Sequence, residues 1–123
     1  MANAYFIRAY CYFMIARVWG DAPLLTTGFE SDRQDDMYPV RTPASEIYAQ
    51  VESDLAEADK LMPATVKEKH KASSAAISML TADYYLWKAK MLGGGNAALE
   101  SAKTAVNKVL NNANYGLEDD FAK

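Results

Sequence analysis

Hydrophobic positions along this chain recur at the three- and four-residue spacing of α-helices, and they do not alternate as they would in exposed strands. The pattern predicts an all-α fold, in which residues 1–123 form one helical segment. Four main helices are expected, at residues 4–19, 43–62, 73–92 and 97–111. A connection at residues 20–42 separates the first two helices and carries no convincing strand pattern.

The first helix is apolar nearly all round, with Arg8 and Arg17 as its strongly polar positions. It is too short and too interrupted by charge to cross a membrane. A helix that is hydrophobic on every side belongs inside a larger body. We therefore expect Cys11 to be a small buried residue, and Trp19, which precedes Gly20 at the helix end, to pack against the protein.

The second helix has clear boundary signals. Thr42 is the expected N-cap, Pro43 suits the first helical position, and Glu46 lies in the first turn, where the helix dipole favours an acid. Pro63 ends the helix. The apolar positions between them form one stripe, which predicts burial of that face against a neighbouring helix.

The third and fourth helices are joined by the glycine turn 93–95, and Asn96 is the expected N-cap of the fourth. Two apolar stripes joined by a tight turn predict an antiparallel hairpin. Ala82 and Tyr85 lie where a tetratricopeptide repeat has a small residue and a tyrosine on its first helix. A single repeat cannot bury both of its faces, so the pattern predicts neighbouring repeats and a fragment of a larger helical superhelix.

Composition excludes several classes of protein. A net charge of −3 lacks the basic footprint of nucleic-acid binding. One cysteine and one histidine cannot supply a disulfide framework or a His-rich metal site, and no metal or other cofactor is expected. The N-terminal residues show neither a basic n-region nor a cleavage site, so no signal peptide is predicted in this chain.

Catalytic chemistry is not indicated either. His70 lies among charged residues and pairs with no recognisable nucleophile, and the pattern selects no pair of carboxylates for glycosidase chemistry. We expect no catalytic residues, and the chain is predicted not to be an enzyme.

The connection at residues 20–42 is longer than most loops, which favours a functional role. It holds the aromatic, acidic and basic side chains that bind sugars, because an aromatic face stacks on pyranose C–H groups and charged groups bind the hydroxyls. The candidate carbohydrate-binding residues are Phe29, Asp32, Tyr38 and Arg41. In the alternative interpretation, the aromatic residues attach the loop to the helices and the acids are solvated.

Several motifs together resemble the SusD/RagB family. Residues 6–13 followed by 17–24 are similar to its aromatic helix and Gly-Asp-Val-Pro-Leu signature, with Ala22 in place of the valine. Arg41-Thr42-Pro43 with the helix behind it resembles the next family block, and the hairpin at 73–111 resembles the tetratricopeptide pair that follows. The resemblance covers nearly the whole chain in the family's order.

This resemblance implies a role in nutrient uptake by Bacteroidetes. Members are several times longer than this chain, and they are outer-membrane surface lipoproteins built on tetratricopeptide-like helices. They bind oligosaccharides or polysaccharides and deliver them to a SusC-like TonB-dependent transporter. By this resemblance, the chain is the non-catalytic scaffold part of such a protein, which touches the membrane only through the lipid anchor of the full-length form.

Two other functions remain open from the sequence. The chain could be a free-standing tetratricopeptide-like module for protein interaction, which would have polar outer sides on its terminal helices; the apolar first helix argues against this. It could also be the helical domain of an enzyme, which would need clustered titratable residues, and the sequence contains none.

Overall fold

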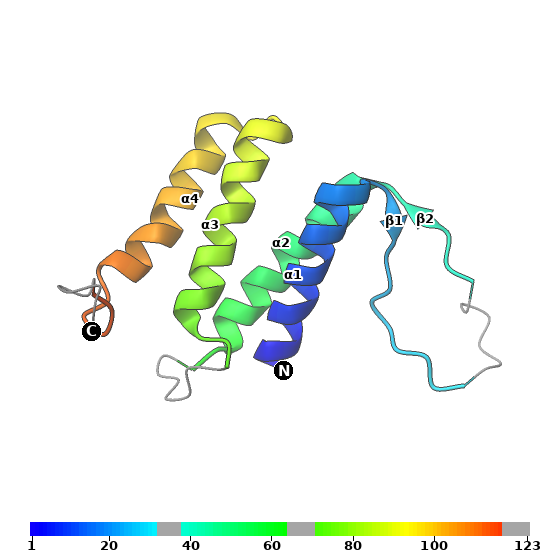
Figure 1. Cartoon of the computed structure of the whole chain (residues 1–123), viewed down its shortest axis with the longest axis horizontal. Coiled ribbons are helices and arrows are strands. Elements are labelled where there is room, and N and C mark those ends of the chain that lie inside the picture. Colours follow the sequence, from blue (N-terminus) through cyan, green and yellow to red (C-terminus); the bar gives the residue numbers. More distant parts are fainter. Residues whose placement is uncertain (32–37, 64–70, 117–123) are drawn as a thin grey trace, which may run out of the picture. The chain divides into compact units, whose positions relative to one another are not determined.

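The computed structural model describes residues 1–31, 38–63 and 71–116, so the expectations for Asp32 and His70 lie outside the described residues. In these three stretches the chain forms four helices and one short strand pair (Figure 1). The helices are α1 (Ala2–Trp19), α2 (Ala44–Leu61), α3 (Ser74–Met91) and α4 (Gly95–Leu110). The strands are β1 (Ala22–Pro23) and β2 (Arg41–Thr42). The all-α prediction is confirmed, and the strand pair is an addition that the hydrophobic pattern did not indicate.

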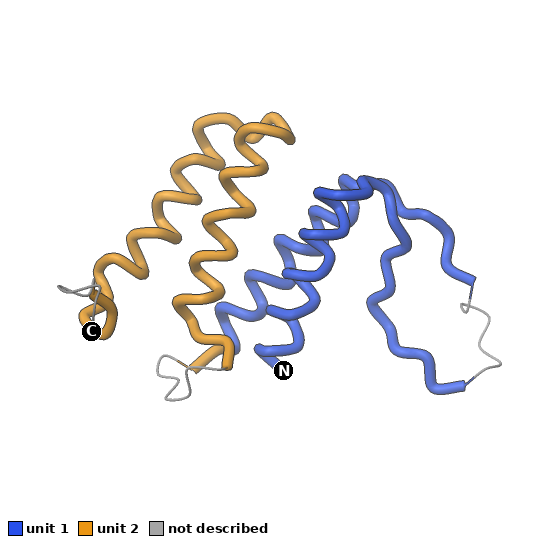
Figure 2. The backbone as a smooth tube through the Cα atoms, viewed as in Figure 1, with its two compact units in different colours: residues 1–61 blue, residues 62–123 orange. Residues whose placement is uncertain are grey.

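The chain divides into two compact units, Met1–Leu61 and Met62–Lys123 (Figure 2). In the first unit α1 packs against α2, and in the second α3 packs against α4. Each unit is an antiparallel helical hairpin (Figure 1). None of the helices in the described stretches is both long enough and apolar enough to cross a lipid bilayer.

The core of the first unit joins one stripe of α1 to the apolar stripe of α2. On α1 the buried residues are Ala9, Phe13 and Ala16. On α2 the buried apolar residues are Ile47, Tyr48, Val51, Leu55 and Ala58. The small side chains of Ala9 and Ala16, which flank Phe13 on this stripe, allow α1 and α2 to approach closely. Phe13 fills the space between the two helices.

Two expectations for α1 are wrong. Cys11 is exposed, and Trp19 is 67% exposed, although both were expected to be buried. The physical reason is that a helix in a two-helix hairpin buries one stripe only. A helix with apolar residues on every side is expected to be buried on every side. In this hairpin, however, α1 has a neighbouring helix on one side only.

The core of the second unit includes large residues of α3 and small residues of α4. Ile77, Leu80 and Tyr84 are buried on α3. The buried residues of α4 are all alanines, at Ala98, Ala102 and Ala105. The small side chains of α4 allow it to pack closely against α3.

The ends of α3 and α4 are set by local chemistry. The Ser73 hydroxyl accepts a hydrogen bond from the Ala76 amide at 3.2 Å and caps α3. The N-cap of α4 is Gly94, so the expectation that Asn96 caps this helix is wrong. Gly94 is packed so closely that a Cβ there would lie 2.8 Å from the Cβ of Ala98. A side chain at the cap position would therefore force its surroundings to shift.

The start of α2 is capped from a distance. The Ala44 amide donates to Oδ1 of Asp21 at 2.8 Å, so the expected cap, Thr42, does not fill this role. Thr42 pairs instead with Ala22 in the two-stranded ladder. The ladder brings Asp21 beside the helix end, and local sequence does not encode this approach.

Candidate functional site

The ends of the long loop are closed by a neck of backbone and side-chain contacts. Ala22 pairs with Thr42, and Pro23 pairs with Arg41, in antiparallel register. The Arg41 guanidinium donates through Nε and Nη2 to the carbonyl oxygen of Asp21, at 3.2 and 2.9 Å. Asp21 thus accepts from Arg41 through its backbone and from α2 through its carboxylate. Both arms of the loop leave from this neck at the same end of the α1–α2 hairpin (Figure 1).

The first arm of the loop is attached to α1 by two side chains. The Tyr12 hydroxyl accepts from the Leu25 amide at 2.7 Å and donates to the Leu25 carbonyl oxygen at 3.1 Å. One turn earlier on the helix, Arg8 donates through Nη1 to the Thr26 carbonyl oxygen at 3.3 Å. Because Leu25 meets Tyr12 and Thr26 meets Arg8, the arm runs back along the helix.

Arg8 is itself held by a buried carboxylate of α2. Its Nε donates to Oδ2 of Asp54 and its Nη2 donates to Oδ1, both at 2.7 Å. Gln50 donates to the same Oδ1 at 2.8 Å. The Asp54 side chain is only 2% exposed. The hydrogen bonds to Asp54 raise the pKa of the Arg8 guanidinium above its usual value, although partial burial opposes them. This bidentate ion pair with Asp54 therefore fixes the Arg8 guanidinium at the position where it donates to the loop.

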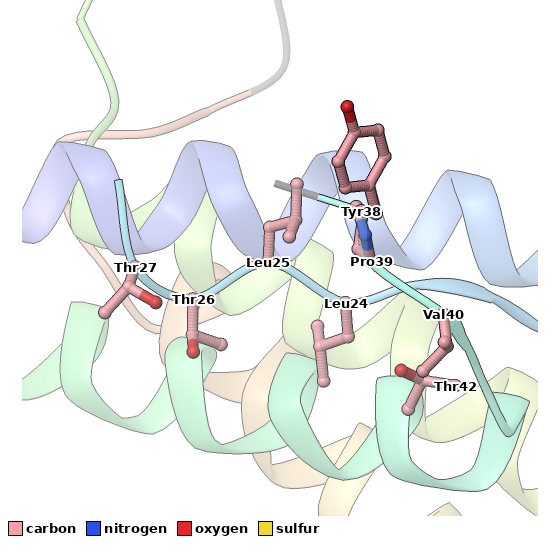
Figure 3. A pocket seen from close by; sticks show the side chains of 8 residues that line it. All are labelled: Leu24, Leu25, Thr26, Thr27, Tyr38, Pro39, Val40 and Thr42. Carbon is pink, nitrogen blue, oxygen red and sulfur yellow. The ribbon is translucent and has the colours of Figure 1, made fainter. Parts of the chain in front are cut away.

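The two arms of the loop line an open pocket of about 390 Å³ (Figure 3). One arm contributes Leu24, Leu25, Thr26 and Thr27, and the other contributes Tyr38, Pro39, Val40 and Thr42. The lining combines apolar side chains with three threonine hydroxyls. The Tyr38 side chain is 91% exposed, and its ring extends from the backbone with the hydroxyl outermost (Figure 3). Such a lining can contact a ligand that presents both C–H faces and hydroxyl groups.

The predicted binding residues occupy different places around this pocket. Tyr38 lines it, whereas Arg41 supports the neck through Asp21. Phe29 is 46% exposed and is not among the lining residues. Asp32 lies outside the described residues.

Sequence reasoning missed the first arm, which supplies half of the lining. Leu24 to Thr27 carry no charged group and only small hydroxyls, so they gave no chemical signal. The pairing of Pro23 with Arg41, which sets the two arms opposite each other, also had no signal in the hydrophobic pattern. In the described stretches, no three His, Cys, Asp or Glu side chains are grouped as they would be around a metal ion.

Comparison with known proteins identifies the family. The family model SusD-like_3, described as "Starch-binding associating with outer membrane", matches residues 1–86. The chain belongs to the SusD-like family. A curated relative, SusD-like protein P2 of Formosa agariphila, is 30% identical over 122 residues. The SusD/RagB resemblance in the sequence is thereby confirmed.

Solved structures share the fold of this segment. B. fragilis NanU is 35% identical with a TM-score of 0.85, and the match covers 98% of this chain. A crystal structure with xylogluco-oligosaccharide has a TM-score of 0.82 at 24% identity over 95% of this chain, a likeness of fold. The chain spans 23% of the length of P2 and 24% of the lengths of NanU and of the xylogluco-oligosaccharide structure. It thus corresponds to about a quarter of a SusD-like protein.

Proposed function

We propose that this chain is the non-catalytic helical scaffold of a SusD-like surface lipoprotein that captures oligosaccharides at the outer membrane for a SusC-like TonB-dependent transporter. Family membership supports the carbohydrate-binding role and the outer-membrane setting. The observation that carries the assignment to this segment is the two-armed pocket with the exposed Tyr38 at its rim. We propose Tyr38 as a ligand-contacting residue, together with Phe29 and Asp32 from the same loop.

The chemistry of the pocket supports this role. A pyranose ring offers a C–H face that stacks on an aromatic ring, and its hydroxyls exchange hydrogen bonds with threonines and backbone groups. Leu24 and Val40 add apolar contact beneath such a ring. Since loops on rigid scaffolds commonly carry binding residues, a loop fixed at its neck and along its first arm is suited to hold them.

Arg41 supports binding indirectly in this proposal. Its guanidinium is bonded to the Asp21 carbonyl oxygen, so its role is to close the neck and set the spacing of the two arms. A direct contact of Arg41 with the ligand is therefore not part of the proposal, in contrast to the expectation from the loop composition.

The proposal is tested by glycan binding to the SusD-like protein that contains this segment. Calorimetric titrations would use maltooligosaccharides, after the family description, and a xylogluco-oligosaccharide, after the structurally similar complex. For an oligosaccharide that binds, Tyr38→Ala should weaken the affinity by about tenfold, as expected for the loss of one stacking contact. Tyr115→Ala removes a half-exposed tyrosine outside this loop and is the control. Equal affinities of wild type and Tyr38→Ala would remove this loop from the binding site.

The remaining parts of the proposal have separate tests. Incubation with the bound oligosaccharide should release no new reducing ends, because no step of catalysis is assigned to this protein. Affinity purification from the native outer membrane should recover a TonB-dependent transporter. A lipid-modified N-terminal cysteine in the mature protein would establish the surface anchor, and recovery of the protein without it would contradict that anchor.

A further inference from the structure

Among the residues that the structure describes, the pocket between the two arms of the loop is lined by uncharged side chains only (Figure 3). Two leucines, a valine and a proline offer apolar contact, three threonines offer hydroxyls, and Tyr38 offers both a ring and a hydroxyl. A hydroxyl group can donate and accept hydrogen bonds, so this lining suits the hydroxyls of a sugar. An ionised group on a ligand would lose water here, and the described lining offers it no counter-ion.

Two arginines contact the loop beside the pocket, and both are bonded to oxygen atoms of the protein. Arg8 donates to both carboxylate oxygens of Asp54 and to the carbonyl oxygen of Thr26. Arg41 donates twice to the carbonyl oxygen of Asp21. An anionic ligand that drew Arg8 away would leave the buried Asp54 carboxylate without its cation, which is costly. Both guanidinium groups are therefore held by structural contacts.

The loop that contains the pocket also carries the net negative charge of the chain. Residues 20–42 include two basic side chains and five acidic ones, whereas the whole chain has 13 basic and 16 acidic side chains. Acids and bases are thus equal in number in the rest of the sequence. The five acids are Asp21, Glu30, Asp32, Asp35 and Asp36, the last three of which lie outside the described residues. An excess of acid in one loop repels anions over a Debye length of about 10 Å.

We infer that the pocket selects uncharged oligosaccharides and rejects those that carry uronate or sulfate groups. The inference rests on the proposed glycan-binding function, and it adds the charge class of the ligand. Protein carboxylates and threonine hydroxyls accept hydrogen bonds from the hydroxyls of a neutral sugar. An ionised carboxylate on the sugar offers no such donor, and it meets a loop of its own sign. The difference between the two affinities sets the selectivity.

The test compares two forms of one oligosaccharide on the SusD-like protein that contains this segment. The neutral form is a maltooligosaccharide or a xylogluco-oligosaccharide, and in the oxidised form its C6 hydroxymethyl groups are carboxylates. Calorimetric titration gives a Kd for each form, and the selectivity ratio is the Kd of the oxidised form divided by that of the neutral form. We expect a ratio of about ten or more at low ionic strength, and it should fall as salt screens the charge of the loop.

A cation placed in the pocket should abolish the selectivity. Val40 lines the pocket and is 81% exposed, so a longer polar side chain has room at this position. Val40→Lys adds an ammonium group. Val40→Gln is its matched control, because it removes the same apolar contact without adding a charge. The two variants should bind the neutral form with similar affinity. The selectivity ratio should stay at about ten in Val40→Gln and fall to about one in Val40→Lys.

The outcomes separate this inference from the proposed function. Tyr38-dependent binding of the oxidised form that is as tight as that of the neutral form, or tighter, would overturn the inference and leave the function intact. A high ratio that neither salt nor Val40→Lys lowers would place the discrimination outside this loop and would also overturn the inference. If Tyr38→Ala changed the affinity for neither form, the loop would not be the glycan site, and both proposals would fail.

Discussion

Arg8 and Asp54, which lie 46 residues apart in the sequence, are joined by two hydrogen bonds of 2.7 Å between a guanidinium and a carboxylate. The same guanidinium also donates to the Thr26 carbonyl oxygen. One arginine therefore links α1 to α2 and both to the first arm of the pocket loop. Paired geometry of this kind is stronger and more directional than a single contact, so it fixes the arm as well as the hairpin.

Removal of Arg8 should destabilise the first unit strongly. In Arg8→Met, the Asp54 carboxylate remains buried without its cation, and the free energy of unfolding should fall by about 2–4 kcal/mol. The measurement is urea denaturation of the 123-residue chain followed by circular dichroism. Lys60→Met removes an exposed cation from the same hairpin and is the control, with a change of less than about 0.5 kcal/mol.

Removal of both partners should cost much less than removal of one. The double variant Arg8→Met, Asp54→Leu replaces the pair by apolar groups, and its stability should lie within about 1 kcal/mol of wild type. Gln50 then loses its acceptor, but its amide can turn toward water. If the double variant were as unstable as Arg8→Met, the ion pair itself would stabilise the unit. The loss in Arg8→Met would then not be due only to the cost of burying an unpaired Asp54 carboxylate.

Loss of the Tyr12 hydroxyl should loosen the loop without unfolding the helices. In Tyr12→Phe, the Leu25 amide loses its 2.7 Å acceptor, so its hydrogen exchange should accelerate by about five- to tenfold. Amides inside α1 and α2 should keep their protection. Tyr10→Phe, on an exposed tyrosine of the same helix, should change neither. Unchanged exchange at Leu25 would contradict the attachment.

The cap of α2 can be assigned by comparing two substitutions. Asp21→Ala removes the acceptor of the Ala44 amide and should lower stability by about 1 kcal/mol, the usual cost of a lost N-cap. Thr42→Ala should cost less than about 0.5 kcal/mol, because Thr42 pairs through its backbone. Thermal unfolding of both variants measures the difference. A larger loss for Thr42→Ala would return the cap to the position that the local sequence suggested.

A side chain at Gly94 should disturb the α3–α4 hairpin. The new Cβ of Gly94→Ala would lie 2.8 Å from the Ala98 Cβ and 3.0 Å from Lys88 Cγ, so α4 must shift. The expected loss is about 1–3 kcal/mol, typical of overpacking. Gly28→Ala adds a methyl group in open space and should be neutral or slightly stabilising. Equal stability of the two variants in urea denaturation would contradict the close contact.

The sequence could predict the helices because helical spacing is a local property. The stripe that includes Ile47, Val51 and Leu55 identifies the buried face of α2 by its spacing alone. The family motifs are equally local, since the stretches around Gly20 and Pro43 that resemble SusD-like proteins lie within residues 1–86, which the family model matches. The presence of a long loop follows from the absence of such spacing between residues 20 and 42.

Only the tertiary structure determined which residues that are distant in the sequence contact each other. Arg8 with Asp54, Tyr12 with Leu25, and Asp21 with Ala44 are separated by 13 to 46 residues, and no local spacing encodes such pairs. The two-residue ladder at the neck set the arms of the pocket opposite each other, and it is too short to leave a strand pattern. Exposure of Cys11 was also decided at this level, because hydrophobicity tells which side chains favour burial, whereas the neighbours in space determine which of them are covered.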